Sequence, residues 1–77
     1  MKVMASFYGP IRRPWPETSR EVELPEDADV GALLASLGYE PEDAKRVAVV
    51  VNGRRRKLVT PLAEGDDVRF AVLAGGG

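Results

Sequence analysis

The strongest constraint on the fold is an uninterrupted apolar run that ends in a tight-turn dipeptide. The run spans Val47–Val51, consists of valine and one alanine, and is followed directly by Asn52-Gly53. β-branched side chains favour pleated strands, and Asn-Gly is a dipeptide that two-residue hairpin turns prefer. A run without polar interruption is typical of a strand covered on both faces. We therefore predict a central strand here, followed by a short basic strand over residues 54–59.

Two more strands are predicted near the N-terminus. Lys2–Tyr8 places every second side chain on one apolar face, and residues 18–24 alternate again. Such a period of two indicates a strand. Residues 9–16 between them contain three prolines, which lack the backbone donor that a helix or a central strand requires. We expect a hairpin across a stiff loop.

One short amphipathic helix is predicted in the middle of the chain. Asp29 is a suitable N-cap residue, and Gly38 suits a left-handed C-terminal stop. Between them the apolar residues recur at helical spacing: Val30, Leu33, Leu34 and Leu37. An isolated helix of under about 12 residues is barely stable in water, so this stripe should pack across the sheet as core. Residues 39–46 are polar and predict a connector with room for one helical turn.

The C-terminal segment alternates again before it becomes glycine-rich. Val68, Phe70 and Val72 face one side, and residues 75–77 are three glycines. The order strand, strand, helix, strand, strand, strand predicts an α+β fold, in which one main helix packs across one face of a mixed sheet of four to five strands. With 77 residues we expect one domain, residues 1–74, followed by a flexible tail.

Composition argues against several classes of function. The chain has no cysteine and no histidine, and therefore no thiol nucleophile and no ordinary zinc or iron–sulfur ligand set. Its formal net charge of −1 gives no field that would attract nucleic acid or an anionic membrane, so neither is expected as a direct partner. The adjacent carboxylates Glu42-Asp43 and Asp66-Asp67 lack a partnering base and are interpreted as solvated turn residues. We expect a cytoplasmic protein without a bound cofactor or metal and without catalysis of its own.

The glycine tail is the segment most suited to chemistry. Glycine has no Cβ, so residues 75–77 could enter a narrow slot that a larger side chain would block. The useful group there would be the terminal carboxylate of Gly77. Three extended residues reach only about 10 Å, which means that a partner must come to the domain. An idle, glycine-rich end is the alternative, because chain termini are often poorly ordered.

Four motifs, taken together, resemble one known family. They are Asp29-Val30-Gly31-Ala32-Leu33-Leu34 at the helix, Val51-Asn52-Gly53 at the hairpin, Leu62-Ala63-Glu64-Gly65-Asp66-Asp67-Val68 before the last strand, and Gly76-Gly77. In this order they resemble the ubiquitin-like β-grasp sulfur carriers, most closely the small subunit of molybdopterin synthase. The proline-rich loop around Trp15 and the additional Gly75 depart from the family pattern, and they bear on the pathway more than on the fold.

The resemblance implies a carrier and not an enzyme. In the family, an E1-like adenylating enzyme uses ATP to activate the terminal carboxylate, and a sulfur donor, such as a persulfide-bearing desulfurase, displaces AMP to leave a thiocarboxylate. Here the thiocarboxylate would form on Gly77, with Gly75, Gly76 and Leu73 in contact with the partner. The sulfur would pass to a molybdopterin precursor inside the large subunit of molybdopterin synthase, which would hold the catalytic residues.

Other functions and surfaces stay open. The same tail chemistry would serve thiamine synthesis or transfer RNA thiolation, a ubiquitin-like modifier would form isopeptide conjugates with lysine, and a plain interaction module would leave the glycines idle. Met4, Tyr8 and Leu73 could project from the sheet face that the helix leaves uncovered. Arg54-Arg55-Arg56-Lys57 is interpreted as a solvated edge that discourages aggregation, although it could steer an acidic partner. Trp15 either anchors a partner or covers one end of the core.

Overall fold

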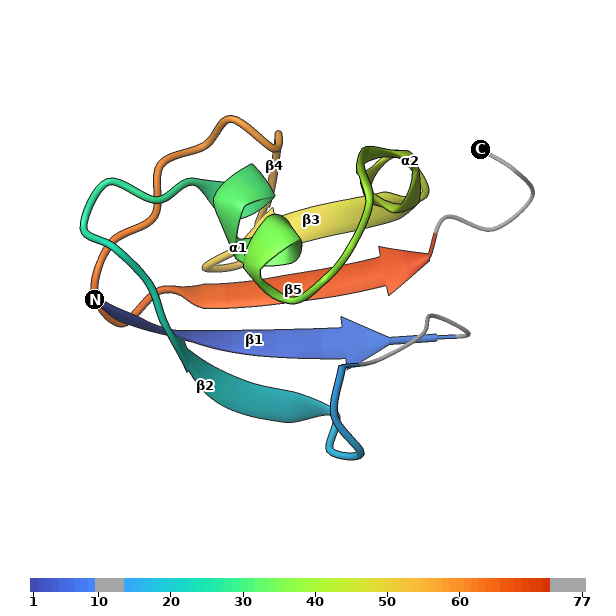
Figure 1. Ribbon diagram of the computed structural model, residues 1–77, viewed down its shortest axis with the longest axis horizontal. Helices are drawn as coiled ribbons and strands as arrows, with labels where there is room; N and C mark the ends of the chain where they lie inside the picture. Colours follow the sequence, from blue (N-terminus) through green and yellow to red (C-terminus); the bar gives the residue numbers. More distant parts are fainter. Residues whose placement is uncertain (10–13, 73–77) are drawn as a thin grey trace.

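A computed structural model describes residues 1–9 and 14–72, which contain five strands and two helices. The elements are β1 (Lys2–Tyr8), β2 (Ser19–Glu23), α1 (Val30–Ser36), α2 (Pro41–Ala44), β3 (Val47–Val51), β4 (Arg54–Arg56) and β5 (Asp67–Val72). The strands form one mixed sheet with the order β2-β1-β5-β3-β4, and α1 packs across one face (Figure 1). The predicted α+β fold with one main helix is confirmed. No helix in these residues is long and apolar enough to cross a bilayer.

The middle strand of the sheet is β5. It runs parallel to β1, with Phe70 beside Phe7, and antiparallel to β3, with Phe70 beside Val49. β1 also pairs with β2 in the predicted hairpin, and β2 is one residue shorter at each end than its alternation suggested. Ladders of hydrogen bonds on both sides therefore fix the backbone of β5.

The prediction that both faces of β3 are covered is wrong. β3 is an interior strand between β5 and β4, and Val47, Val49 and Val51 are buried, but Ala48 and Val50 are only half-buried on the other face. Valine suits either face of a strand, because packing on a half-buried pleated surface favours β-branched side chains. An apolar run therefore does not show by itself that a second layer covers the sheet.

β4 ends at Arg56 and is shorter than predicted, because the residues after it bond to α1 instead of to the sheet. The carbonyl of Leu58 accepts a hydrogen bond from the amide of Gly31 at 2.9 Å, and the carbonyl of Thr60 accepts from Val30 at 3.1 Å. These amides are among the donors that the start of a helix leaves unpaired. The turn after β4 is thereby attached to the first turn of α1.

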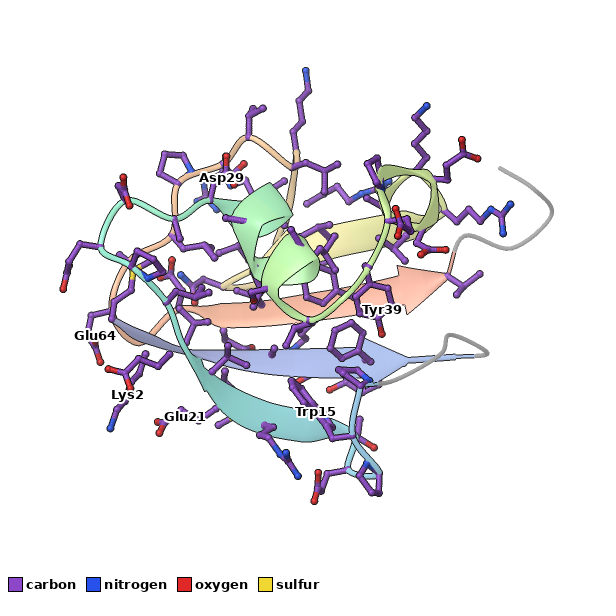
Figure 2. All side chains as sticks on the ribbon, in the orientation of Figure 1. Lys2, Trp15, Glu21, Asp29, Tyr39 and Glu64 are labelled. Carbon is purple, nitrogen blue, oxygen red and sulfur yellow. The ribbon has the colours of Figure 1, made fainter. Side chains whose placement is uncertain are left out.

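Both ends of α1 match their sequence signals. Asp29 lies at the start of the helix, where its Oδ1 accepts a hydrogen bond from the amide of Ala32 at 2.7 Å (Figure 2). Gly38 follows the helix with φ of 89°, in the left-handed region. The buried residues of the helix are Val30, Leu33 and Leu34. Leu37 was predicted in the same stripe but is the C-cap residue and only half-buried.

An aromatic cluster closes the core at the end of the sheet where β1 and β5 finish. The ring of Phe7 stacks on Phe70, with 4.9 Å between ring centroids, and on Tyr39, at 5.5 Å. Trp15 meets Phe7 edge to face, with 5.8 Å between ring centroids, and is 9% exposed. Figure 2 labels Trp15 and Tyr39 at this end of the sheet. The guanidinium of Arg20 lies 5.2 Å from the centroid of the Trp15 ring. Trp15 therefore covers one end of the core, which decides between the two roles that the sequence left open.

Candidate functional site

The predicted reactive end of the chain lies outside the described residues. This holds for Gly77, which would carry the reactive carboxylate, for the predicted partner contacts Leu73, Gly75 and Gly76, and for the predicted domain boundary after residue 74. The structure does describe the end of β5, to which these residues are joined in the sequence. The candidate site is the surface around that end.

Three strand ends meet at this site. β1 and β5 are parallel and finish at the same edge, and β3 begins there because it is antiparallel to β5 (Figure 1). Val72 lies opposite Val47 of β3, and Ala71 lies opposite Tyr8 of β1. Gly9 follows with φ of 82°, and a Cβ added to it would lie 4.0 Å from the backbone nitrogen of Val72. Val72, the last described residue, therefore has a defined position between β3 on one side and Gly9, just after β1, on the other.

The sheet face that α1 leaves uncovered carries an apolar row beside this end. Alternation along each strand places Tyr8, Ala71 and Ala48 next to one another on that face, from β1, β5 and β3. Val50 lies two residues further along β3, and Tyr8 is 42% exposed. We call Tyr8, Ala48, Val50 and Ala71 the open-face patch. The patch lies beside Val72, the last described residue.

Polar groups border the patch along the strands. Arg69 of β5 pairs with Asp67, with Nε and Oδ2 2.9 Å apart. Met4 is 40% exposed on the same face, but its neighbours in register are Glu21 and Asp67. Met4 and Tyr8 were both predicted to project from the uncovered sheet face. Tyr8 belongs to the open-face patch, whereas Met4 lies outside it, between two acidic residues.

Three of the four carboxylates that stand as adjacent pairs in the sequence make structural hydrogen bonds. Asp43 Oδ2 accepts from the amide of Glu40 at 3.0 Å and helps to close α2, the predicted single helical turn. Asp66 accepts from Nδ2 of Asn52 at 2.9 Å, and Asp67 forms the ion pair described above. These contacts are all solvent-exposed, in line with the interpretation as solvated residues, but Asp43 lies in α2 and Asp67 begins β5, so these two are not turn residues. Among the described residues, no group of three or more histidine, cysteine or carboxylate side chains could hold a metal ion.

Sequence reasoning missed the small side chains of the open-face patch. Ala48 and Ala71 lie within apolar strand sequences, which gives no sign that these two residues face away from the core. The available signal was the alternation of the strand: Ala71 lies between Phe70 and Val72, which face inward, so Ala71 faces the other side of the sheet. This alternation identifies an exposed residue only once it is known that helices cover just one face of the sheet.

The sequence and the fold are both similar to those of known sulfur carrier proteins. The model of the ThiS family matches residues 7–77. The molybdopterin synthase sulfur carrier subunit of Mycobacterium tuberculosis is 34% identical over 82 residues, covering 100% of this chain and 99% of that protein. A chain in the complex of subunits 1 and 2 of the molybdopterin-converting factor from Helicobacter pylori 26695 is 27% identical, with a TM-score of 0.68 and 100% of both chains covered. SAMP1 of Haloferax volcanii has a TM-score of 0.78 over 100% of both chains but 18% identity, which shows the fold alone.

Proposed function

The chain belongs to the ThiS family, and we propose that it is a sulfur carrier whose C-terminal carboxylate, on Gly77, is converted to a thiocarboxylate. The observation that carries the proposal is the 34% identity to a sulfur carrier subunit over the full length of this chain. The chain has no cysteine, so the terminal carboxyl group is the group best suited to hold sulfur.

The proposed chemistry has two steps. A carboxylate oxygen of Gly77 attacks the α-phosphorus of ATP on an E1-like adenylating enzyme, and pyrophosphate leaves. Sulfur from a donor then attacks the acyl carbon and displaces AMP. When the donor is a persulfide-bearing desulfurase, the acyl disulfide that forms is cleaved by a thiol, which leaves the thiocarboxylate on Gly77 and a disulfide on the donor. Glycine suits this position because no neighbouring side chain hinders the approach of nucleotide or sulfur donor. The chain itself supplies only the acyl group, and its partners supply the catalysis.

The described structure supports the proposal through what lies around the end of β5. Ordering the three glycines in a partner would cost roughly 3 to 6 kcal/mol, at about 1 to 2 kcal/mol per residue. Contacts elsewhere on the chain must offset this cost, and the open-face patch beside the end of β5 offers apolar side chains that a partner could bury.

The proposed recipient is a molybdopterin precursor, bound in the large subunit of molybdopterin synthase. The names of the M. tuberculosis relative and of the H. pylori complex favour this recipient. Thiamine synthesis and transfer RNA thiolation would use the same acyl chemistry and are the nearest alternatives. A ubiquitin-like modifier, in which a lysine amine captures the activated carboxylate, is the alternative from another class.

Intact-mass spectrometry tests the proposal. The chain is incubated with its adenylating enzyme, ATP and a sulfur donor, and we expect a mass gain of one oxygen-to-sulfur replacement, located on Gly77 by tandem spectra. Adding the large subunit and precursor should then remove the sulfur. The control omits ATP and should show no gain. Lysine conjugates without any thiocarboxylate would favour the modifier, and transfer only to a thiamine or transfer RNA pathway enzyme would replace the recipient.

A further inference from the structure

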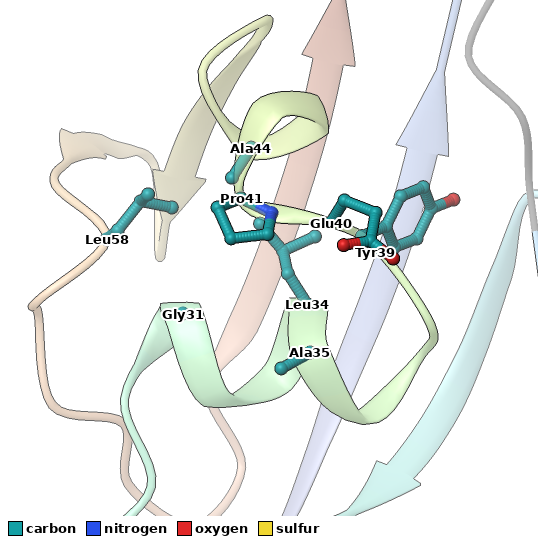
Figure 3. A pocket seen from close by; sticks show the side chains of 8 residues that line it. All are labelled: Gly31, Leu34, Ala35, Tyr39, Glu40, Pro41, Ala44 and Leu58. Atoms are coloured by element: carbon teal, nitrogen blue, oxygen red, sulfur yellow. The ribbon is translucent and has the colours of Figure 1, made fainter.

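An apolar groove lies on the side of the sheet that α1 covers, away from the open-face patch. Its lining residues are Gly31, Leu34, Ala35, Tyr39, Glu40, Pro41, Ala44 and Leu58. Leu58 forms one side of it, and Leu34, Pro41 and Ala44 form the other (Figure 3). Its volume is about 200 Å³, and an apolar cavity of about 150 Å³ already holds benzene. The groove is therefore large enough for one leucine or phenylalanine side chain.

Backbone hydrogen bonds hold both sides of this groove in place. The Leu58 carbonyl accepts from the amide of Gly31 at 2.9 Å, which ties that side to α1. On the other side, Pro41 begins α2, whose turn is closed by reciprocal bonds between Glu40 and Asp43. A ligand would meet a preformed site and would lose little free energy in ordering it.

A row of four cations directly precedes Leu58 in the chain. Its members are all exposed and are Arg54, Arg55, Arg56 and Lys57. Arg54 and Arg56 pair in register with buried valines of β3, so they lie on the α1 side of the sheet, whereas Arg55 pairs with Val50 and lies on the other side. None of the four forms an ion pair with another described residue. Their charges are therefore available to a partner.

An exposed apolar residue follows the groove-lining Leu58 in the chain. Val59 directly follows Leu58 and is 75% exposed. Among the residues that line the groove, the charged one is Glu40 on the α2 side, so a partner's carboxylates are favoured on the opposite, Leu58 side. The chemical complement of this surface is an apolar anchor flanked by carboxylates.

We propose that the groove, Val59, Arg54, Arg56 and Lys57 form a second docking surface, the helix-side surface, for an acidic segment of a partner protein that carries one leucine or phenylalanine. The apolar side chain fills the groove, and the carboxylates lie against the cations. A protein segment fits better than nucleic acid, because the groove is apolar and the chain's net charge is −1. The helix-side surface and the open-face patch lie on opposite sides of the sheet, so one protein can hold the chain while another engages its C-terminal residues.

NMR titration of the whole chain with three synthetic peptides tests this surface. The first peptide has one leucine between runs of aspartate and glutamate, the second has alanine in place of leucine, and the third has lysine in place of the acids. We expect the first to shift the amide signals of Ala35, Ala44 and Leu58. The alanine peptide should bind about tenfold more weakly, because the groove stays unfilled. The lysine peptide should not bind, and added salt should weaken the first peptide, since exposed charges are screened.

Two pairs of matched variants locate the binding. Arg56→Glu should weaken the acidic leucine peptide about five- to tenfold, as expected for reversing one exposed charge pair. Arg55→Glu changes the same charge in the same strand on the other side of the sheet, and should leave the affinity nearly unchanged. Within α1, Ala35→Glu should block the groove, whereas Ala32→Glu, also exposed but not lining it, should not.

Several results would overturn the proposal. In the titration, they are the absence of binding by any peptide at millimolar concentration, equal binding of acidic and basic peptides, and amide-signal shifts at Tyr8 and Ala71 in place of the groove residues. In the variants, the contradicting result is an equal loss of affinity for Arg55→Glu and Arg56→Glu. A short single-stranded RNA that binds the arginines more tightly than the peptide, without shifting Ala35 or Ala44, would replace the protein partner by nucleic acid. The readout does not involve the C-terminal glycines, so failure here would leave the sulfur-carrier proposal untouched.

Discussion

At the scale of single residues, Asn52 serves the hairpin turn and the start of β5 at once. Its φ of 52° lies in the left-handed region, which asparagine tolerates better than most residues. Its Nδ2 donates to Asp66 Oδ1, and its Oδ1 accepts from the amide of Asp67, both at 2.9 Å. The β3–β4 turn is thereby joined to residues that directly precede or begin the middle strand. The sequence predicts the turn from Asn-Gly but not this second role.

Substitution of Asn52 should separate the two roles. Asn52→Ala loses the side-chain bonds and also strains the backbone, and we expect it to lower the free energy of unfolding by about 1 to 3 kcal/mol. Asn52→Gly loses the same bonds but keeps the backbone conformation at no steric cost, and its loss should be smaller. Urea denaturation of both variants measures the difference. If glycine costs as much as alanine, the positive φ contributes nothing to stability.

At the scale of elements, the start of α1 depends on the cap and the turn after β4 together. The side chain of Asp29 bonds the amide of Ala32, and backbone carbonyls of Leu58 and Thr60 bond the two preceding amides. The helix is only seven residues long, which is too short to be stable alone in water. Its stability therefore comes from the buried leucines and from these satisfied donors.

Removing the cap should have a measurable but limited effect. Asp29→Ala leaves only the Ala32 amide without its partner, and we expect a loss of about 0.5 to 2 kcal/mol in unfolding free energy. Asp27→Ala removes the same charge from a nearby exposed position and should be close to neutral. Paired thermal melts would measure both variants. A loss for Asp27→Ala as large as that for Asp29→Ala would attribute the effect to net charge and not to capping.

At the scale of the whole molecule, the sheet presents two sides with different chemistry. The open-face patch lies beside the end of β5, and the helix-side surface lies across the sheet from it. Because β5 is held between β1 and β3, the proposed reactive end begins at a fixed point relative to both surfaces. A partner that binds the patch would therefore also hold Val72, the residue from which the C-terminal segment starts.

A charge placed in the patch should impair activation without unfolding the domain. We expect Ala71→Glu to raise the KM of the adenylating enzyme for the chain by about tenfold or more, because a carboxylate would be buried unpaired against the partner. Ala32→Glu introduces the same charge on exposed α1 and should leave the KM nearly unchanged. ATP–pyrophosphate exchange measures the KM, and circular dichroism checks that both variants fold. Equal KM values for the two variants would remove the patch from the interface.

The position of the carboxylate is tested by lengthening the chain. One residue added after Gly77 moves the carboxylate by about 3.3 to 3.6 Å, and a misplacement near 1 Å can already cost about a hundredfold in rate. We expect pyrophosphate exchange to be abolished while the melting temperature stays nearly the same. Deleting Gly77 instead leaves Gly75 and Gly76 as a shorter pair and should keep partial activity. An extended chain that exchanges at the wild-type rate, without being trimmed, would falsify the proposed mechanism.

The amino-acid sequence by itself determined the features that depend on a few neighbouring residues. These include the alternation of β1 and β5, the cap at Asp29, the stop at Gly38 and the turn at Asn52, because backbone dihedrals and local hydrogen bonds set them. The tertiary structure alone decided that β5 is the middle strand, that β4 ends at Arg56 and that Trp15 is buried. These features, like the groove beside Leu58, depend on which distant segments share one core. The periodicity of a segment shows which of its faces is buried, but not which distant segment covers that face.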